Sequence, residues 1–375
     1  VLSAATGDFA KTRIGVDHAR ATTEMTDEWL AAALGDTKPA LFTPFRPAEG
    51  YAQSRDELQN ADEAIANDYW DGRLSREKRL ISLLMMRTPK RYNRPLIDIQ
   101  DLSPILDRMR MVKSEREIAL IRRASQLAGL GMMEAIRSTE DGVYEYQLDG
   151  VMRYMFIING AQLDAYRAIT ASGWDNIWNG HYFRNDRQMR DGDVVLMDYA
   201  PDYRYYVSDI GRVWPVSGTY DPVQREILSV VLAWRNEILA RIRPSVTPEQ
   251  IRREAALAME DYFRDHKFSK KRYEKAARKM VETGGSAFSH MVGMAVHDPG
   301  RYQDEVLQPG FVISIDPSIW VNEEKLYMRY EDTVVVTEDG VENFTDFLPA
   351  ELDELEALVK EEGVLQKLPP VSDWP

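Results

Sequence analysis

Hydrophobic residues fall at helical spacing in several stretches of the chain, and the clearest of these stretches begins after residue 113. Ser114 and Glu117 have the spacing of a capping box, in which side chain and backbone hydrogen bonds fix a helix start. The apolar positions that follow lie close to helical periodicity: Ile118, Ile121, Leu127, Met132 and Ile136. A second capping box at 247–250 opens another predicted helix. The pattern therefore predicts long amphipathic helices in the middle of the chain.

Short apolar runs bounded by turn residues alternate with these helices and predict strands. We predict strands at 40–45, 194–197, 204–207, 311–315 and 333–337. We predict helices at 54–71, 78–86, 144–158, 221–242, 247–265, 265–282 and 352–362. This mixture of elements predicts an α+β fold. Because the pattern changes near residues 103–113, we predict two domains, 1–108 and 109–375.

Composition excludes several classes of protein and site. The 375 residues carry a formal net charge of −14 and include no cysteine. A disulfide scaffold, a zinc finger, an iron–sulfur site and a thiolate nucleophile are therefore excluded. An acidic chain without a long Lys/Arg cluster argues against nucleic acid as a partner. No apolar run approaches the roughly 18 residues of a membrane span, so we expect none.

The acidic excess is typical of a solvated surface, and so is the Lys- and Arg-rich stretch 265–282. The first residue is Val1 rather than Met, so we expect a segment upstream of it. The compartment therefore stays open between the cytoplasm and, if a signal peptide preceded Val1, the periplasm or the exterior.

Four acidic residues lie at the ends of predicted strands in the second half of the chain: Asp198, Asp209, Asp316 and Glu331. A hairpin formed by 194–197 and a strand at 205–210 would bring Asp198 and Asp209 together. A carboxylate at the end of a buried strand is costly without a partner. Each alone is typical of a turn or cap, but converging carboxylates indicate a metal site. Three of the five histidines lie in or next to the same part of the chain: His181, His290 and His297.

Residues 112–350 resemble the pita-bread metallopeptidases, which comprise aminopeptidase P, prolidase, methionine aminopeptidase and the related creatinase. Five separated segments carry the resemblance in order and spacing: 192–199, 206–218, 289–298, 307–317 and 329–334. The pattern is closest to Xaa-Pro aminopeptidase. The resemblance implies a catalytic pita-bread fold over 109–375, preceded by a smaller, shortened creatinase-type α/β domain over 1–108.

The resemblance also implies a site with two divalent metal ions. Its ligands map onto five residues: Asp198, Asp209, His290, Asp316 and Glu331. Carboxylates with one imidazole are mostly hard ligands, which favours Mn²⁺, with Co²⁺ and Zn²⁺ as alternatives. The family assigns His297 to the substrate carbonyl region and His181 to substrate binding or proton transfer. Arg329 would support the ligand carboxylates.

The resemblance implies an Xaa-Pro aminopeptidase that acts on peptides with a free N-terminus and forms a homodimer or higher homo-oligomer. Three alternatives stay open: an Xaa-Pro dipeptidase, a creatinase-like C–N hydrolase and a non-catalytic pita-bread binding protein. Three positions depart from the family pattern. Asp316 replaces the usual Glu, Ser286 stands where aminopeptidase P and prolidase carry a further histidine, and Gly211 replaces a common threonine. These departures bear on proline specificity and rate more than on metal binding.

Overall fold

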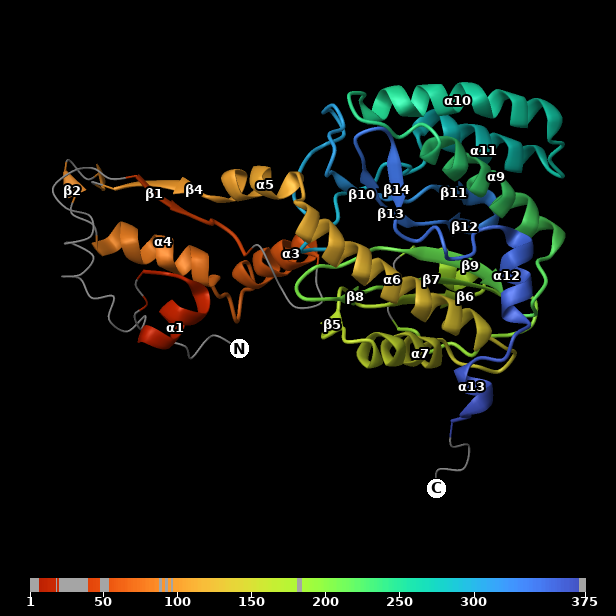
Figure 1. Ribbon diagram of the computed structural model, residues 1–375, viewed down its shortest axis with the longest axis horizontal. Helices are drawn as coiled ribbons and strands as arrows, with labels where there is room; N and C mark the ends of the chain where they lie inside the picture. Colours follow the sequence, from red (N-terminus) through yellow and green to blue (C-terminus); the bar gives the residue numbers. More distant parts are fainter. Residues whose placement is uncertain are drawn as a thin grey trace. The chain divides into compact units, whose positions relative to one another are not determined.

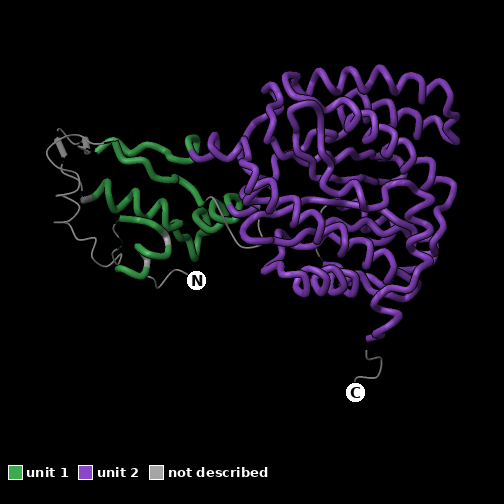
Figure 2. The backbone as a smooth tube through the Cα atoms, in the orientation of Figure 1, with its two compact units in different colours: residues 1–48, 59–105 green, residues 49–58, 106–375 purple. Residues whose placement is uncertain are grey.

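The chain divides into two compact units, which Figure 2 shows in separate colours. The computed structural model describes residues 7–17, 19, 40–47, 54–87, 90–91, 94–95, 97–180 and 184–370. One unit comprises residues 1–48 and 59–105, and the other comprises residues 49–58 and 106–375. The segment 49–58 is thus grouped with the larger unit, although it precedes most of the smaller one in sequence. That 1–108 and 109–375 fold as separate domains stays a prediction.

The smaller unit is built around a parallel pair of strands. Strand β1 (Ala40–Thr43) pairs with β4 (Asp98–Asp101), with Ala40 opposite Asp98 and Thr43 opposite Asp101. The other described elements of this part of the chain are α1 (Gly7–Ile14), α3 (Arg55–Ala66), α4 (Arg76–Arg87), β2 (Lys90–Arg91) and β3 (Arg94–Pro95). Lys78 Nζ on α4 lies 2.6 Å from Asp62 Oδ2 on α3, which ties these two helices together. The strand predicted at 40–45 and the helices predicted at 54–71 and 78–86 are therefore confirmed, the first helix being shorter than predicted.

The larger unit contains most of the described helices. They are α5 (Ser103–Met111), α6 (Glu115–Arg137), α7 (Glu145–Ile158), α8 (Trp174–Ile177), α9 (Pro222–Leu239), α10 (Pro248–Asp265), α11 (Lys271–Thr283), α12 (Leu352–Val359) and α13 (Val364–Lys367), with a 3-10 turn at Asn322–Glu324. In Figure 1, α6 and α7 run along one side of the strands, and α10 and α11 run along the other. Among the described residues, no helix is long and apolar enough to span a membrane.

Two three-stranded antiparallel sheets form the centre of the larger unit. One has the order β6 (Ile169–Ser172), β7 (Val194–Asp198), β9 (Gly211–Pro215), and the other has the order β10 (Val312–Ile315), β13 (Asp332–Val336), β14 (Val341–Asn343). Two pairs of shorter strands flank them: β5 (Leu163–Asp164) with β8 (Pro201–Asp202), and β11 (Ser318–Val321) with β12 (Leu326–Arg329). A single bridge between Gly211 and Glu331, with N···O distances of 3.1 and 3.0 Å, joins the two main sheets.

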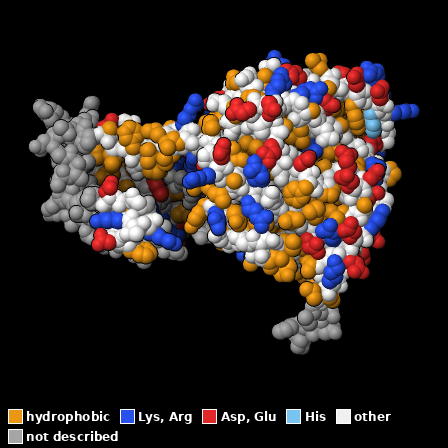
Figure 3. All heavy atoms as spheres, viewed as in Figure 1, with side chains coloured by type: hydrophobic (Ala, Val, Ile, Leu, Met, Phe, Trp, Pro, Cys, Tyr) orange, Lys and Arg blue, Asp and Glu red, His pale blue; other side chains and the backbone are white. Residues whose placement is uncertain are grey.

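The central strands are covered on both faces. Every residue of β7, β9 and β13 is buried, which explains why the sequence of β7 is apolar up to Asp198 and does not alternate with polar residues. Trp214 and Trp234 are fully buried in the same core. Acidic and basic side chains are interspersed over the face of the larger unit that Figure 3 shows, as expected of a solvated surface.

The long predicted helices are confirmed, one of them with a shifted start, and one strand prediction is wrong. Ser114 and Glu117 form the predicted capping box, and Thr247 accepts a hydrogen bond from the amide of Gln250. The helix predicted over 265–282 begins only at 271, after an extended stretch. The strand predicted at 204–207 is a turn, because Arg204 and Tyr205 have φ of 56° and 70°, a conformation that strands do not contain. Asp209 therefore precedes β9 instead of ending a strand.

Asp149 on α7 is a partly buried acid that hydrogen-bonds to β6, so its titration reports on the contact between this helix and that strand. Its carboxylate accepts hydrogen bonds from the Thr170 hydroxyl and the Asn185 amide. Burial nevertheless raises the pKa of Asp149 from 3.8 to about 6. The folded chain then binds a proton that the unfolded chain has lost, so this group's contribution to stability falls as pH rises from about 4 to about 6.

We expect Asp149→Asn to remove this pH dependence. Relative to the parent chain, the variant should gain about 2 kcal/mol of unfolding free energy between pH 4 and pH 7, because most of the pKa shift, converted at about 1.36 kcal/mol per unit, takes effect in this range. Urea unfolding at both pH values measures the difference. A parent–variant difference that is the same at both pH values would contradict the buried-carboxylate interpretation.

Candidate metal-binding active site

Strand pairing brings three carboxylates together at the ends of the central strands. Asp198 is the last residue of β7, and in the β7–β9 ladder it lies opposite Gly211. The bridge from Gly211 to Glu331 then places the start of β13 beside the same point. Asp209 lies two residues before β9. Ligand atoms of Asp198, Asp209 and Glu331 all lie within 4.8 Å of one another, and all three residues are buried.

Gly211 suits this close approach. A Cβ at position 211 would lie 3.2 Å from the Cβ of Glu331, which is a tight contact. Glu331 would have to move by a few tenths of an ångström to admit a side chain. The glycine that departs from the family pattern therefore lets the two strand ends meet without this adjustment.

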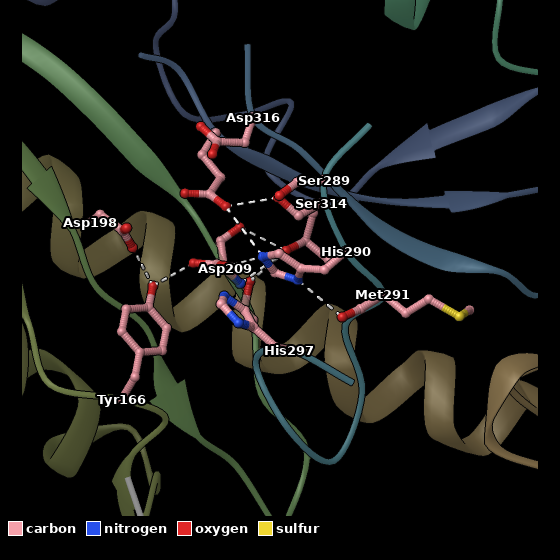
Figure 4. A network of polar contacts seen from close by, with 12 residues as sticks. Tyr166, Asp198, Asp209, Ser289, His290, Met291, His297, Ser314 and Asp316 are labelled. Carbon is pink, nitrogen blue, oxygen red and sulfur yellow. Dashed lines mark hydrogen bonds and ion pairs between the residues drawn. The ribbon is translucent and has the colours of Figure 1, made fainter. Parts of the chain in front are cut away.

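The carboxylates lie at the wall of a cavity of about 490 Å³. Two histidines line it as well, and their rings pack against each other with centroids 4.1 Å apart. Figure 4 shows His290 and His297 side by side next to Asp209, with Asp316 on the far side of the cluster. Asp209, His290 and His297 form a second group whose ligand atoms lie within 4.8 Å of one another.

Tyr166 connects two of the carboxylates. Its hydroxyl oxygen lies 2.6 Å from Asp198 Oδ1 and 2.7 Å from Asp209 Oδ1 (Figure 4). A hydroxyl has one proton, so it donates to one carboxylate at a time. The second carboxylate oxygen then faces the hydroxyl oxygen without a proton between them. That contact is favourable only when the carboxyl group itself is protonated or a cation lies nearby.

Arg329 is the buried cation of the cluster. It forms an ion pair with Asp198, and its Nη1 lies 3.5 Å from Asp316 Oδ2 and 3.6 Å from Glu331 Oε2. The Arg329 side chain is only 6% exposed, so these interactions are screened little by water. One guanidinium offsets one of the four acidic charges around it. The remaining charge requires protons or metal ions.

His290 is held in the tautomer that a metal ligand needs. Its Nδ1 lies 3.1 Å from the carbonyl oxygen of Met291, so Nδ1–H donates and Nε2 keeps its lone pair. Nε2 lies 3.2 Å from Asp209 Oδ2 and 4.0 Å from Glu331 Oε1. The lone pair therefore lies next to two carboxylate oxygens.

Two carboxylate oxygens of the cluster are buried and accept no hydrogen bond. They are Glu331 Oε2 and Asp316 Oδ1. The other Glu331 oxygen accepts a hydrogen bond of 2.7 Å from the Ser314 hydroxyl. A buried unpaired oxygen costs a few kcal/mol and indicates an ion or water at that position. The donor set, hard oxygens with one imidazole nitrogen, fits divalent metal ions.

The pKa values of the clustered carboxyl groups also agree with a site for divalent metal ions. Burial, with the nearby Asp198, raises the pKa of Asp209 well above its usual value. Burial also raises the pKa of Glu331, with contributions from Asp209 and Asp198, and the pKa of Asp316, with a contribution from Glu331. These carboxyl groups therefore bind protons more tightly than free ones do, and metal ions would compete with those protons.

Residues 119–338 match the model of metallopeptidase family M24. The chain belongs to metallopeptidase family M24. Enzymes of this family use divalent metal ions, which agrees with the donor set described above.

Curated relatives of the M24 chain include proline-specific peptidases. The chain is 32% identical over 275 residues to an Xaa-Pro aminopeptidase of Escherichia coli, covering 69% of this chain and 62% of the relative. It is 28% identical over 252 residues to an Xaa-Pro dipeptidase of Pyrococcus horikoshii, covering 66% of each. The chain thus spans less than two thirds of the length of such relatives.

Solved structures show the same fold. Aminopeptidase P from E. coli with the inhibitor Pro-Leu superposes with a TM-score of 0.71 at 27% identity, covering 94% of this chain and 77% of that one. The M24 chain therefore has the α+β pita-bread fold that the sequence predicts.

The structure gathers most of the predicted site residues of the M24 chain. Asp198, Asp209, His290 and Glu331 lie together, and His297 and Arg329 line the same cavity. Asp316 lines the cavity but belongs to neither group of close ligand atoms found among the described residues. Its side chain is one methylene shorter than the usual Glu, which explains the larger separation. His181 lies outside the described residues, so its role stays a prediction.

Sequence reasoning missed the residues that hold these groups in place. Tyr166, Ser314 and the Met291 carbonyl each contact one or two site residues. Tyr166 lies in a short connection without periodicity, and a backbone carbonyl leaves no trace in a sequence. Met291 and Ser314 both lie inside recognised segments, but only the Ser314 side chain, a hydroxyl, could have been weighed from the sequence as a partner for Glu331.

We expect Mn²⁺ to stabilise the M24 chain, and Asp209→Asn to abolish the effect. At a free concentration of 100 times Kd, a bound ion adds about 2.7 kcal/mol to the free energy of unfolding. Without metal, Asp209→Asn removes a buried repulsive charge and should raise the Tm at pH 8. Differential scanning calorimetry with EDTA and with Mn²⁺ measures both effects.

Asp339→Asn, which changes an exposed acid in the turn between β13 and β14 and outside the lining of the site cavity, is the matched control and should respond to Mn²⁺ like the parent. An equal Mn²⁺ response in Asp209→Asn and the parent would remove Asp209 from the ligand set.

Proposed function

We propose that this M24 chain is a metal-dependent exopeptidase that hydrolyses the bond between an N-terminal residue and a penultimate proline. The observation that carries the proposal is the convergence of Asp198, Asp209 and Glu331 with His290 at one cavity wall. The relatives named for Xaa-Pro peptidase activity support the substrate class. Because the chain spans only part of their length, the whole activity is part of the proposal.

Five residues would hold two divalent ions: Asp198, Asp209, His290, Asp316 and Glu331. Bound ions at such a site polarise the scissile carbonyl and lower the pKa of a bound water, so that hydroxide is available near neutral pH. The unpaired oxygens of Glu331 and Asp316 support their place in the set. Mn²⁺ is the proposed metal, since hard oxygen donors dominate.

The other residues of the cavity would orient the reacting groups. Arg329 holds Asp198 and faces Asp316 and Glu331, so it keeps the carboxylates from spreading apart. Tyr166 holds a proton between Asp198 and Asp209. His297 lies beside His290 at the cavity, where an imidazole can donate a hydrogen bond to a substrate carbonyl as charge develops on its oxygen.

A peptide panel with Mn²⁺ tests the proposal. We expect hydrolysis of Ala-Pro-Ala, release of the N-terminal alanine, and loss of turnover in Asp209→Ala by at least about a thousandfold. The panel also contains Ala-Pro, Met-Ala-Ala and creatine, and product release is followed by mass spectrometry.

Other outcomes would identify the alternatives. Cleavage of Ala-Pro alone would favour a dipeptidase, and metal-independent cleavage of creatine would favour a creatinase-like C–N hydrolase. Tight peptide binding without turnover would favour a binding protein. Each of these results would overturn the aminopeptidase proposal, as would unchanged turnover in Asp209→Ala.

Ser286 is proposed to widen the range of second residues that the site accepts. Ser286, Ser318 and Trp320 line both the site cavity and a second cavity of about 400 Å³. Ser286 and Ser318 thus belong to a wall that the two cavities share, and their side chains are small. A penultimate residue larger than proline would therefore find room.

We expect Ser286→His to lower kcat/KM for Ala-Phe-Ala about tenfold or more relative to Ala-Pro-Ala, because the imidazole closes this wall. Position 286 has φ of 61°, which histidine adopts more readily than most residues do. Ser217→His, at an exposed position, is the control. An unchanged selectivity ratio would contradict a role for Ser286 in substrate choice.

A further inference from the structure

His297 has a hydrogen-bond partner far away in sequence. Its Nδ1 lies 2.9 Å from Asp56 Oδ1, although 241 positions separate the two residues. Asp56 lies in the segment 49–58, which is grouped with the larger unit, so the contact lies within one compact unit. It also lies outside residues 119–338, the part of the chain that matches the M24 model.

The local sequence fixes the position of Asp56. Ser54 and Glu57 form a reciprocal cap at the start of α3, with Ser54 N 3.3 Å from Glu57 Oε2 and Glu57 N 3.4 Å from Ser54 Oγ. Arg55 Nη1 donates to Asp107 Oδ1 at 2.6 Å, which anchors this turn to α5. The turn that carries Asp56 is therefore held from both sides.

This first turn of α3 reaches the site cavity. Ser54, Asp56 and Glu57 line the same cavity as the carboxylate cluster. The capping interactions use the Ser54 and Glu57 side chains, whereas the Asp56 side chain is directed at His297. Among these three residues, Asp56 is thus the one whose carboxylate contacts a site histidine.

The backbone of His297 is anchored separately. The next residue, Asp298, is buried and pairs with Lys113, at 2.9 Å, and with Arg110. These ion pairs fix the loop but do not touch the imidazole, which can still rotate about its Cβ–Cγ bond. The ring packs against His290 with centroids 4.1 Å apart and an interplanar angle of 46° (Figure 4). The orientation of the ring and the nitrogen that carries its proton are therefore decided by the partner of Nδ1.

We propose that Asp56 is a positioning residue for His297. Its carboxylate accepts the Nδ1–H of the imidazole, which selects this tautomer, fixes the ring plane and leaves Nε2 for the ligands of the cavity. A carboxylate that orients a histidine in this way commonly changes activity or metal affinity by about 10- to 100-fold when it is removed. The assignment of the tautomer stands on geometry alone, and only its kinetic consequence rests on the proposed function.

Nitrogen NMR on ¹⁵N-histidine-labelled protein tests the tautomer directly. The sequence holds only five histidines, and His297→Gln identifies the resonance of His297. We expect Nδ1–H for His297 in the parent chain loaded with Zn²⁺, a diamagnetic ion, and a change to Nε2–H in Asp56→Ala. Asp56→Asn keeps a carbonyl oxygen that can accept Nδ1–H, so it should preserve the tautomer. The Asp56 side chain is 58% exposed, so its removal leaves no buried unpaired charge and the variants should fold.

Kinetics with Ala-Pro-Ala and Mn²⁺ give the second measurement. We expect Asp56→Ala to lower kcat about 10- to 100-fold with little change in KM, and Asp56→Asn to restore part of the loss. Glu63→Ala removes an exposed acid from the same helix and should change neither measurement.

An Nε2–H tautomer in the parent, or the same tautomer in the parent and in Asp56→Ala, would overturn the proposal. So would an equal loss of kcat in Asp56→Ala and Glu63→Ala. A parent chain that hydrolyses no peptide but shows the expected tautomers would refute the proposed function and leave the role of Asp56 standing.

Discussion

The burial of three carboxylates within 4.8 Å of one another is the constraint on which the larger unit depends. At an effective dielectric constant near 20, two such charges 4 Å apart repel by about 4 kcal/mol. Arg329 offsets only part of this repulsion. The strands that carry the carboxylates must therefore be held by other interactions, and the completely buried β7, β9 and β13 provide them. The sheet core thus offsets the repulsion among the carboxylates in the metal-free chain, and bound cations would remove that repulsion.

Two adjacent acids, Glu331 and Asp332, have opposite environments in the fold. Glu331 faces the cavity with one oxygen unpaired, and burial with nearby acids raises its pKa. Asp332, the next residue, is equally buried, but Arg212 and Arg235 hold its pKa well below the usual range despite the burial. Successive residues near a strand point to opposite sides, so Asp332 meets two arginines, whereas Glu331 meets other acids, the Ser314 hydroxyl and a single arginine, Arg329.

Proton positions at the site are set by partners that are not themselves ligands. The Met291 carbonyl fixes the proton of His290 on Nδ1, and Tyr166 holds one between Asp198 and Asp209. Asp56 stands in the same relation to His297. Each contact leaves one defined lone pair or proton directed at the cavity. The chemistry of an M24 site therefore depends on these supporting groups as well as on the metal ligands.

The sequence by itself determined the helices, the buried strands, the α+β fold and the identity of the clustered acids, because apolar periodicity and strand-end carboxylates are local signals. It failed at Arg204 and Tyr205, whose positive φ turns a β-like stretch into a corner. Only the tertiary structure decided that Asp316 stands apart from the close ligand groups, that Tyr166 links two acids and that Asp56 reaches His297. These contacts join residues from separate segments, and no spacing in one sequence records which side chains meet after the chain has folded.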